Sequence, residues 1–423
     1  MGLPRRLVLV VVAVLATATP LTGQSLAAPV SKPEGVESPA PLSLEEAVRL
    51  ASERHPLVRA AAGSVRAVRG AAREAAAFPN PIVEWSREGV GGLPTEDRFL
   101  TASLPLDLSA RRLALRSAVG AETLQARADS AALVRQVEYE AATAYVHAAL
   151  ATELLALETA RREALEAIAD FDANRLREGA VAEVAAMRAR LEADRARLDE
   201  AEARAEASRA RAELARAIAI PVEDMPPLEP LRSPRTTALD LESALQIAFG
   251  SRPELQAARA GVEAARHHLR AERRGVIPEV ELIGGIKETA GDRGAVIGMS
   301  VPIPLFDRNG GARERASGDR QVAEAVLDDT RARVEAEVVA AYTAYHDLLR
   351  ALPAERKALG ATGEEVARII EAAYREGGAT LVEVLEARRA AAESRASELR
   401  WIAQLQLALL DLNLAIGVPL VEP

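Results

Sequence analysis

The sequence of 423 residues contains no cysteine and few aromatic residues, and each scarcity narrows the range of proteins that it can encode. Without cysteine there are no disulfides, no thiolate chemistry and no acylated N-terminal cysteine. Aromatic residues make up 3% of the chain, too few for several ordinary globular cores. The net charge of -9 argues against a nucleic-acid surface. The abundant residues are Ala, Arg, Glu and Leu, which favour long helices.

No residue pattern indicates catalysis or metal binding. The sequence has no Ser/His/Asp set, phosphate loop or metal-ligand spacing, so we expect neither an enzyme nor a cofactor. Of the five histidines, His267 and His268 are adjacent, and their side chains would point about 100° apart on a helix, which does not make a chelating pair. The sequence therefore predicts no metal site.

The N-terminus has the pattern of a signal peptide over residues 1–28. Arg5 and Arg6 precede a short apolar stretch at 7–16, and small residues at 25–28 suit cleavage. The apolar stretch is too short to span a bilayer. We therefore expect secretion across the inner membrane, followed by a proline-rich linker at 29–41.

The rest of the chain is an internal duplication. Residues 42–84 align without a gap with 239–281 at an offset of 197, with 15 identities in 43 positions. The alignment returns further on, where 179–221 matches 377–419 at an offset of 198. We expect two structurally equivalent repeats, at 42–221 and 239–419, joined by a linker at 222–238.

Each repeat is expected to contain very long helices. After Pro105 the next proline is Pro221, so the stretch between them can be helical with one interruption at Gly179. A helix formed by the residues between Gly179 and Pro221 would be on the order of 60 Å long. Near the C-terminus an apolar seam of coiled-coil spacing comprises Ile402, Leu405, Leu409, Leu412 and Ile416.

A β-hairpin interrupts the helices at the same place in each repeat. The first strand pair is predicted at 82–88 and 98–106 around a turn at 89–94, and the second at 279–287 and 295–303 around a turn at 289–294. Strands of this length with one apolar face are typical of outer-membrane barrels, but four strands cannot close one. Several chains would have to share a barrel. The alternative is a small soluble sheet that caps a helical bundle.

Together, these features resemble the TolC family of outer-membrane efflux factors over essentially the whole mature chain. The most specific segments are 42–47, repeated as 239–244, and 377–387. Residues 80–81 and 302–309 look like the CzcC-like heavy-metal efflux branch. The resemblance implies a mainly α homotrimer with a small β part. A long α-helical coiled-coil barrel would cross the periplasm, and each chain would add four transmembrane β-strands to a shared barrel in the outer membrane of a Gram-negative-type cell.

The function implied by the resemblance is a passive exit duct of a tripartite RND-type efflux system for heavy-metal cations. Its partners would be a periplasmic adaptor protein, an inner-membrane RND-type transporter and outer-membrane lipid. Multidrug efflux and type I secretion remain alternatives within the family. A periplasmic coiled-coil adaptor or scaffold is the alternative from another class.

The resemblance also assigns roles to individual residues. It places a periplasmic gate at Glu383, Glu386, Tyr374 and Glu183. Glu383 and Glu386 would form acidic rings in a trimer, and Tyr374 and Glu183 would bridge neighbouring helices and hold the closed state. It places adaptor contacts at the hairpin tips Glu178, Gly179, Ala180, Val181, Arg375, Glu376, Gly377 and Gly378. One position departs from the family, because Ala379 stands where some members carry an arginine clamp.

Overall fold

The computed structural model describes residues 40–89, 96–234, 239–359 and 362–419. The predicted signal peptide lies outside these residues, as do the linker up to residue 39 and the first hairpin turn beyond Gly89. All statements below concern the described residues.

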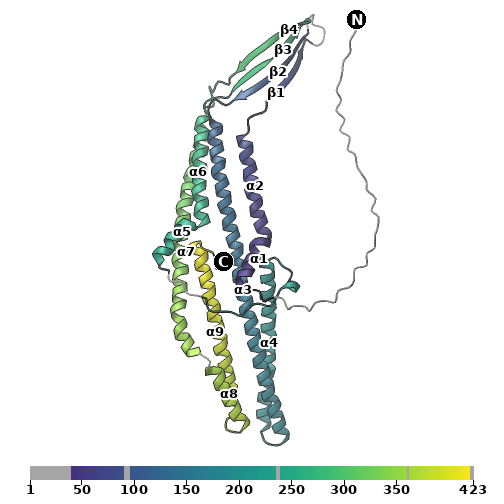
Figure 1. Ribbon diagram of the computed structural model, residues 1–423, viewed down its shortest axis with the longest axis vertical. Helices are drawn as coiled ribbons and strands as arrows, with labels where there is room; N and C mark the ends of the chain where they lie inside the picture. The colour runs from purple at the N-terminus through teal and green to yellow at the C-terminus, as the bar shows by residue number, and fades with distance from the viewer. Residues whose placement is uncertain (1–39, 90–95, 235–238, 360–361, 420–423) are drawn as a thin grey trace, which may run out of the picture. The chain divides into compact units, whose positions relative to one another are not determined.

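The two repeats follow the same order of two short helices, a β-hairpin and long helices (Figure 1). The first comprises α1 (Leu44–Arg54), α2 (Pro56–Ala76), β1 (Ile82–Glu88), β2 (Asp97–Leu106), α3 (Arg111–Arg177) and α4 (Glu183–Ala217), followed by the 3-10 helix η1 (Val222–Asp224). The second comprises α5 (Leu241–Ser251), α6 (Pro253–Arg274), β3 (Val280–Thr289), β4 (Asp292–Ser300), α7 (Gly310–Leu359), α8 (Thr362–Arg375) and α9 (Leu381–Ile416). The repeats differ where the 67-residue α3 corresponds to two helices, α7 and α8.

Similar local signals start the equivalent helices. Ser43 and Asp240 each accept the backbone N–H of the residue three positions on, at 3.2 Å and 2.9 Å, and so cap α1 and α5. Pro56 and Pro253 are the first residues of α2 and α6, where the missing proline N–H leaves no helical hydrogen bond unmade. The duplication therefore preserves the chemistry of the helix starts.

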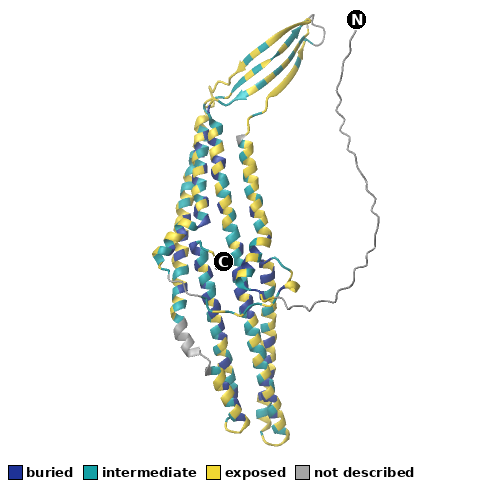
Figure 2. Cartoon of the chain, in the orientation of Figure 1, coloured by how far each residue is buried: buried dark blue, intermediate teal, exposed yellow. Residues whose placement is uncertain are grey.

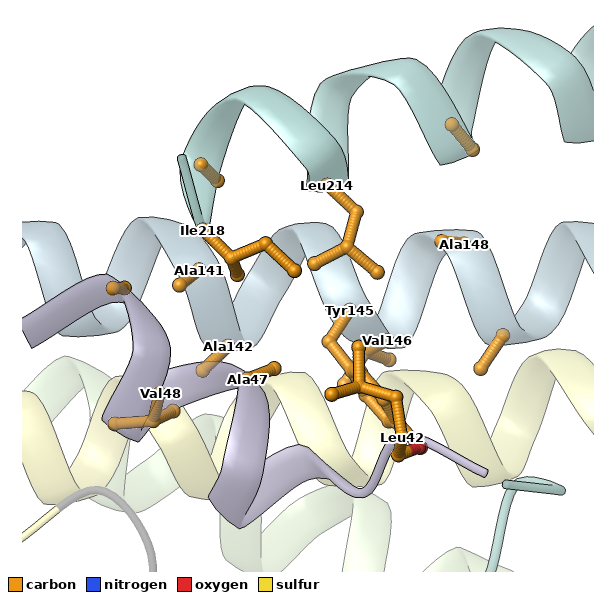
Figure 3. Close-up of a cluster of buried hydrophobic side chains, with 14 of the residues drawn as sticks. Leu42, Ala47, Val48, Ala141, Ala142, Tyr145, Val146, Ala148, Leu214 and Ile218 are labelled. Carbon is orange, nitrogen blue, oxygen red and sulfur yellow. The ribbon is translucent and has the colours of Figure 1, made fainter. Parts of the chain in front are cut away.

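Alanine-rich packing holds the helices together. In the first repeat, α1 and the end of α4 both pack on α3, and the shared cluster includes Leu42, Val48, Val146 and Leu214 together with buried alanines (Figure 3). Tyr145 is buried here and donates a hydrogen bond to the carbonyl of Leu42 over 2.9 Å. Small side chains let helices approach closely, and buried residues accordingly follow the facing sides of the long helices (Figure 2).

The C-terminal seam is confirmed as part of the core. Ile402, Leu405, Leu412 and Ile416 are at most 7% exposed, and Leu409 packs against the same cluster. Among the described residues, α9 is the one helix whose length and apolar composition would allow it to cross a membrane. Half of its most apolar window is buried inside the protein.

The four strands form one antiparallel sheet in the order β1-β2-β3-β4, with β2 and β3 joining the repeats. The first hairpin matches its predicted strands to within one residue. The second has a tighter turn than predicted: only Ala290 and Gly291, with φ of 50° and 96°, lie between the paired Thr289 and Asp292. Two positive φ values are typical of a type I′ turn, and as a result β4 begins and ends three residues earlier than predicted.

Candidate functional site

The two helical hairpins reverse direction through turns that are built alike. Gly179 and Gly377 have φ values of 73° and 83°, which glycine adopts without strain. In each turn the following N–H bonds the carbonyl five residues back, at 2.8 Å in the first and 2.7 Å in the second. The predicted tip residues Glu178, Gly179, Ala180, Arg375, Glu376, Gly377 and Gly378 are exposed, and Val181 is half-buried.

Beneath the second turn, Tyr374 links α8 to α3. Its hydroxyl donates to Asp172 Oδ1 over 2.5 Å, and the two residues are 5% and 0% exposed. Burial, together with this hydrogen bond, raises the pKa of Tyr374 to about 12. The Phe171 ring packs edge-on at 6.0 Å, and the Arg175 guanidinium lies 5.7 Å from the Tyr374 ring centre. Glu183, for which a bridging role was also expected, is exposed at the first position of α4.

Asp172 is a residue that sequence reasoning missed. Its Oδ2 is buried and has no hydrogen-bond partner among the described residues, and Oδ1 lies 4.0 Å from the guanidinium group of Arg175. A buried carboxylate is costly unless donors satisfy it. The Tyr374 hydroxyl is therefore important for holding α8 against α3.

Glu383 caps its own helix. Its Oε2 accepts the N–H of Thr380 at 2.7 Å and the Thr380 hydroxyl at 2.9 Å, while its own N–H donates to Thr380 Oγ at 3.3 Å. The bonds from the Thr380 N–H and hydroxyl lower the pKa of Glu383. The side chain is exposed and carries its charge at neutral pH, so capping does not prevent a role in an acidic ring.

Glu386 lies exposed beside a groove between α9 and the α3–α4 hairpin. The groove is lined by side chains of both charge signs, among them Arg161, Arg195 and Glu393. In the described part of the chain, no three His, Cys, Asp or Glu side chains are grouped so that they could hold a metal ion. The groove is therefore a mixed-charge surface next to the tips.

An ion-pair network that the sequence did not suggest fixes α8 to α9. Arg388 Nε donates to Glu371 Oε2 over 2.9 Å, and Arg388 Nη1 donates to Glu364 Oε1 over 2.9 Å. Glu371 is 9% exposed and also accepts from Arg375 over 2.6 Å. Tyr374 joins α8 to α3, and these ion pairs join α8 to α9. Near the second turn, α8 is therefore held against two neighbouring helices.

Strand register divides the sheet into two chemically different faces. The first, here called the apolar face, carries Val83, Trp85, Leu100, Ala102, Leu104, Leu282, Ile286, Ala295, Ile297 and Met299. Trp85 is 66% exposed and Ile297 is 91% exposed. Large apolar side chains exposed together over four strands indicate a surface that is covered in the functional assembly.

The opposite side of the sheet, here called the polar face, is mostly acidic in its charge. It carries Glu84, Glu88, Asp97, Glu281 and Asp292 against the single basic residue Lys287. Three of the carboxylates share one row beside the turns, since Glu88 pairs with Asp97, and Thr289 pairs with both Asp97 and Asp292. Lys287 binds Asp97 at 2.6 Å, which leaves the face with a net charge of about -4 from five acids and one base.

Comparisons with known proteins agree on the type of protein. Residues 244–418 match the family model described as outer membrane efflux protein. The cobalt-zinc-cadmium resistance protein CzcC of Cupriavidus metallidurans is 24% identical over 290 residues. That alignment covers 65% of this chain and 66% of CzcC, just under two thirds of each.

Solved structures match over a larger part of the chain. A crystal structure of CusC, described in terms of transmembrane channel formation, has a TM-score of 0.74 at 20% identity, with 89% of this chain and 92% of that chain covered. The open-state outer membrane channel MtrE of Neisseria gonorrhoeae has a TM-score of 0.74 at 21% identity, with 89% of both chains covered. At these identities, the likeness establishes the fold.

Proposed function

Since the chain belongs to the TolC family of outer membrane efflux proteins, in its CzcC-like branch, we propose that it is the passive exit duct of a tripartite RND-type efflux system for heavy-metal cations. The duct hydrolyses nothing, and an inner-membrane RND-type transporter supplies the energy. A periplasmic adaptor protein connects the two. The chain functions as a homotrimer in the outer membrane, after export with a cleaved signal peptide.

The edges of the sheet support the proposal of a trimer. β1 and β4 are the two outer strands, so each has one side without a neighbouring strand in the described chain. In lipid, unpaired backbone groups are too costly to leave exposed, and barrels of four strands do not close. Pairing β4 of one chain with β1 of the next would close twelve strands in three copies.

The observation that supports cation cargo most strongly is the acidic polar face. In a membrane barrel the apolar side of each strand faces lipid, so the polar side lines the lumen. The row of Glu88, Asp97 and Asp292 would then place nine carboxylates around the outer mouth of a trimer. Rings of carboxylates favour the passage of cations. The CzcC likeness, to a protein of cobalt, zinc and cadmium resistance, points to metal cations within that class.

The tips of the helical hairpins are the proposed gate and adaptor surface. Both turns are exposed, which suits contact with an adaptor. Glu383 and Glu386, one helical turn apart on α9, would form two acidic rings at the narrow end. The Tyr374–Asp172 hydrogen bond holds the closed tip. Arg175, stacked on Tyr374, supplies a cation near this bond, although Ala379 offers no arginine clamp.

A charge-removal experiment in planar bilayers tests the cation assignment. Glu88→Gln and Glu281→Gln remove carboxylates from the polar face, whereas Glu288→Gln removes one from the opposite side of β3 as a matched control. We expect cation selectivity, measured by the reversal potential in a salt gradient, to fall in the first two variants and to stay unchanged in the third. Equal effects in all three would contradict a carboxylate-lined lumen.

Drug or protein cargo would be favoured by a different result. A wide pore without charge selectivity in the wild-type trimer would fit multidrug efflux or type I secretion better than metal cations. The periplasmic adaptor or scaffold alternative predicts a protein that is extracted without detergent and conducts no ions.

A further inference from the structure

The outer end of the apolar face carries a row of charged residues that the duct function does not use. Strand pairing places Arg87 opposite Arg98, Arg98 opposite Glu288, and Glu288 opposite Arg293. Directly opposed residues on one face of an antiparallel pair have Cβ atoms about 4.5–5.5 Å apart. We propose that this arginine row binds the phosphate groups of phosphorylated lipid headgroups in the outer leaflet. The proposal rests on the proposed function, which puts the sheet in the outer membrane.

The position of the row suits a headgroup. The next row inward on the same face is Trp85, Leu100, Ile286 and Ala295, so the charges begin where the apolar band stops. Tryptophan is enriched at the interface between hydrocarbon and headgroups. The row lies next to the hairpin turns, at the end of the sheet away from the helices (Figure 1). With the helices in the periplasm, this end meets the outer leaflet.

The charge of the row favours an anion. Arg87 and Arg98 are directly opposed like charges, which is unfavourable in a sheet, and the single carboxylate of Glu96 offsets one of the two charges. Glu96 contacts both guanidinium groups, at 3.8 Å in the case of Arg98, and Glu288 lies 3.4 Å from Arg293 Nε. Three guanidinium groups thus face two carboxylates, so a net charge of about +1 per chain is left.

The guanidinium groups retain the capacity to bind a further anion. The side chains of Arg87, Arg98 and Arg293 are 38%, 52% and 76% exposed. Each guanidinium has five N–H donors in a planar fork that matches a phosphate, and the contacts with Glu96 and Glu288 use few of them. Arg293 has the most exposed side chain and a long ion pair, so it is the best placed to contact a headgroup.

The two faces differ in charge at this end. The neighbouring row on the polar face holds Glu88, Asp97 and Asp292, whereas the arginines are all on the apolar face. At the other end of the apolar face, the paired residues Leu106 and Val280 carry no charge. On the apolar face, positive charge is therefore confined to the end that would meet outer-leaflet phosphates. If this end of the sheet contacted only water, nothing would require the arginines to lie on one face and the acidic residues on the other.

The test compares lipid binding by the purified full-length trimer in detergent. The probes are diphosphoryl lipid A, the same lipid with both phosphates removed, and inorganic phosphate, and the readout is the trimer melting temperature across a titration of each. We expect diphosphoryl lipid A to bind at least about tenfold more tightly than the dephosphorylated lipid, the equivalent of one charge-assisted hydrogen bond. Arg98→Gln combined with Arg293→Gln should abolish the preference. Arg308→Gln, an exposed charge at the helix end of the sheet, should retain it.

Three results would overturn the proposal. These are equal binding of the two lipids by the wild-type trimer, an undiminished preference in the double variant, or stabilisation by inorganic phosphate equal to that by diphosphoryl lipid A. The last would indicate a general anion site. Conductance measured on the same protein preparations distinguishes failure of the lipid-binding proposal from failure of the proposed duct function. A trimer that conducts ions but shows no lipid preference refutes only lipid binding by the arginine row.

Discussion

Replacing Tyr374 with phenylalanine should shift the helix tips toward an open state. The substitution keeps the ring and its packing on Phe171 but removes the hydroxyl that donates to the fully buried Asp172 over 2.5 Å. A hydrogen bond to a charged group contributes about 1.5–3 kcal/mol. If the bond is broken when the tip opens, the open population should rise about 10- to 150-fold.

Single-channel recording in planar bilayers measures this shift as time spent at high conductance, and hydrogen exchange of α8 measures it as lost protection. Tyr139→Phe is the matched control, because Tyr139 also donates to a carboxylate, Asp411, over 2.5 Å, but links α3 to α9 away from the tips. An open fraction that rises equally in both variants, or in neither, would refute the assignment of Tyr374 to the closed state.

The pH dependence of this bond has a defined direction. Burial and the bond to Asp172 raise the pKa of Tyr374 to about 12. A raised pKa in the folded state means that the stabilisation is fully present below the ordinary tyrosine value near 10 and is lost as pH rises through about 12. Wild-type gating should therefore be insensitive to tyrosine ionisation between pH 7 and 10.

Two further predictions concern stability. Thr380→Ala removes the side-chain half of the capping box with Glu383 and should destabilise the start of α9 by about 1 kcal/mol, seen as faster hydrogen exchange there. Because the pKa of Glu383 is lowered in the folded state, its contribution to the free energy of unfolding is present above pH of about 4.5 and is lost as pH falls through the folded-state pKa. The destabilisation caused by Thr380→Ala should therefore be smaller in acid. Gly285→Ala should lower the melting temperature of the trimer, because the added Cβ would lie 2.3 Å from the carbonyl oxygen of Leu100. Gly284→Ala is the control, because its Cβ would meet open space and should leave the melting temperature unchanged. Equal melting temperatures of the two variants would contradict the close contact of β2 and β3.

Much of the fold could be predicted because local signals and the duplication agree. The caps at Ser43 and Asp240 and the prolines that follow recur at one offset, so each repeat supports the other. The first hairpin was readable from the turn predicted at 89–94 between its two strands. The position of β4 was not, because its turn places Ala290 at positive φ without the Asn-Gly or Asp-Gly pair that usually marks such a turn.

The candidate site was only partly visible in the sequence. Asp172 looks like any other acid on a helix, since its burial depends on α8, which lies about 200 residues further along the chain. The Thr380–Glu383 spacing is a readable capping box, yet the resemblance drew attention to Glu383 only as a gate residue. The separation of acidic and basic residues onto opposite faces of the sheet depends on the register between β2 and β3, which belong to different repeats. Alternation within one strand does not determine that register.

The reversal potential of the wild-type trimer in a planar bilayer with a KCl gradient tests the central claim most directly. A duct with an acidic lumen and acidic tip rings predicts a conducting pore whose reversal potential has the sign of cation selectivity. A detergent-extracted trimer that does not conduct, or that conducts with anion selectivity, would contradict the account.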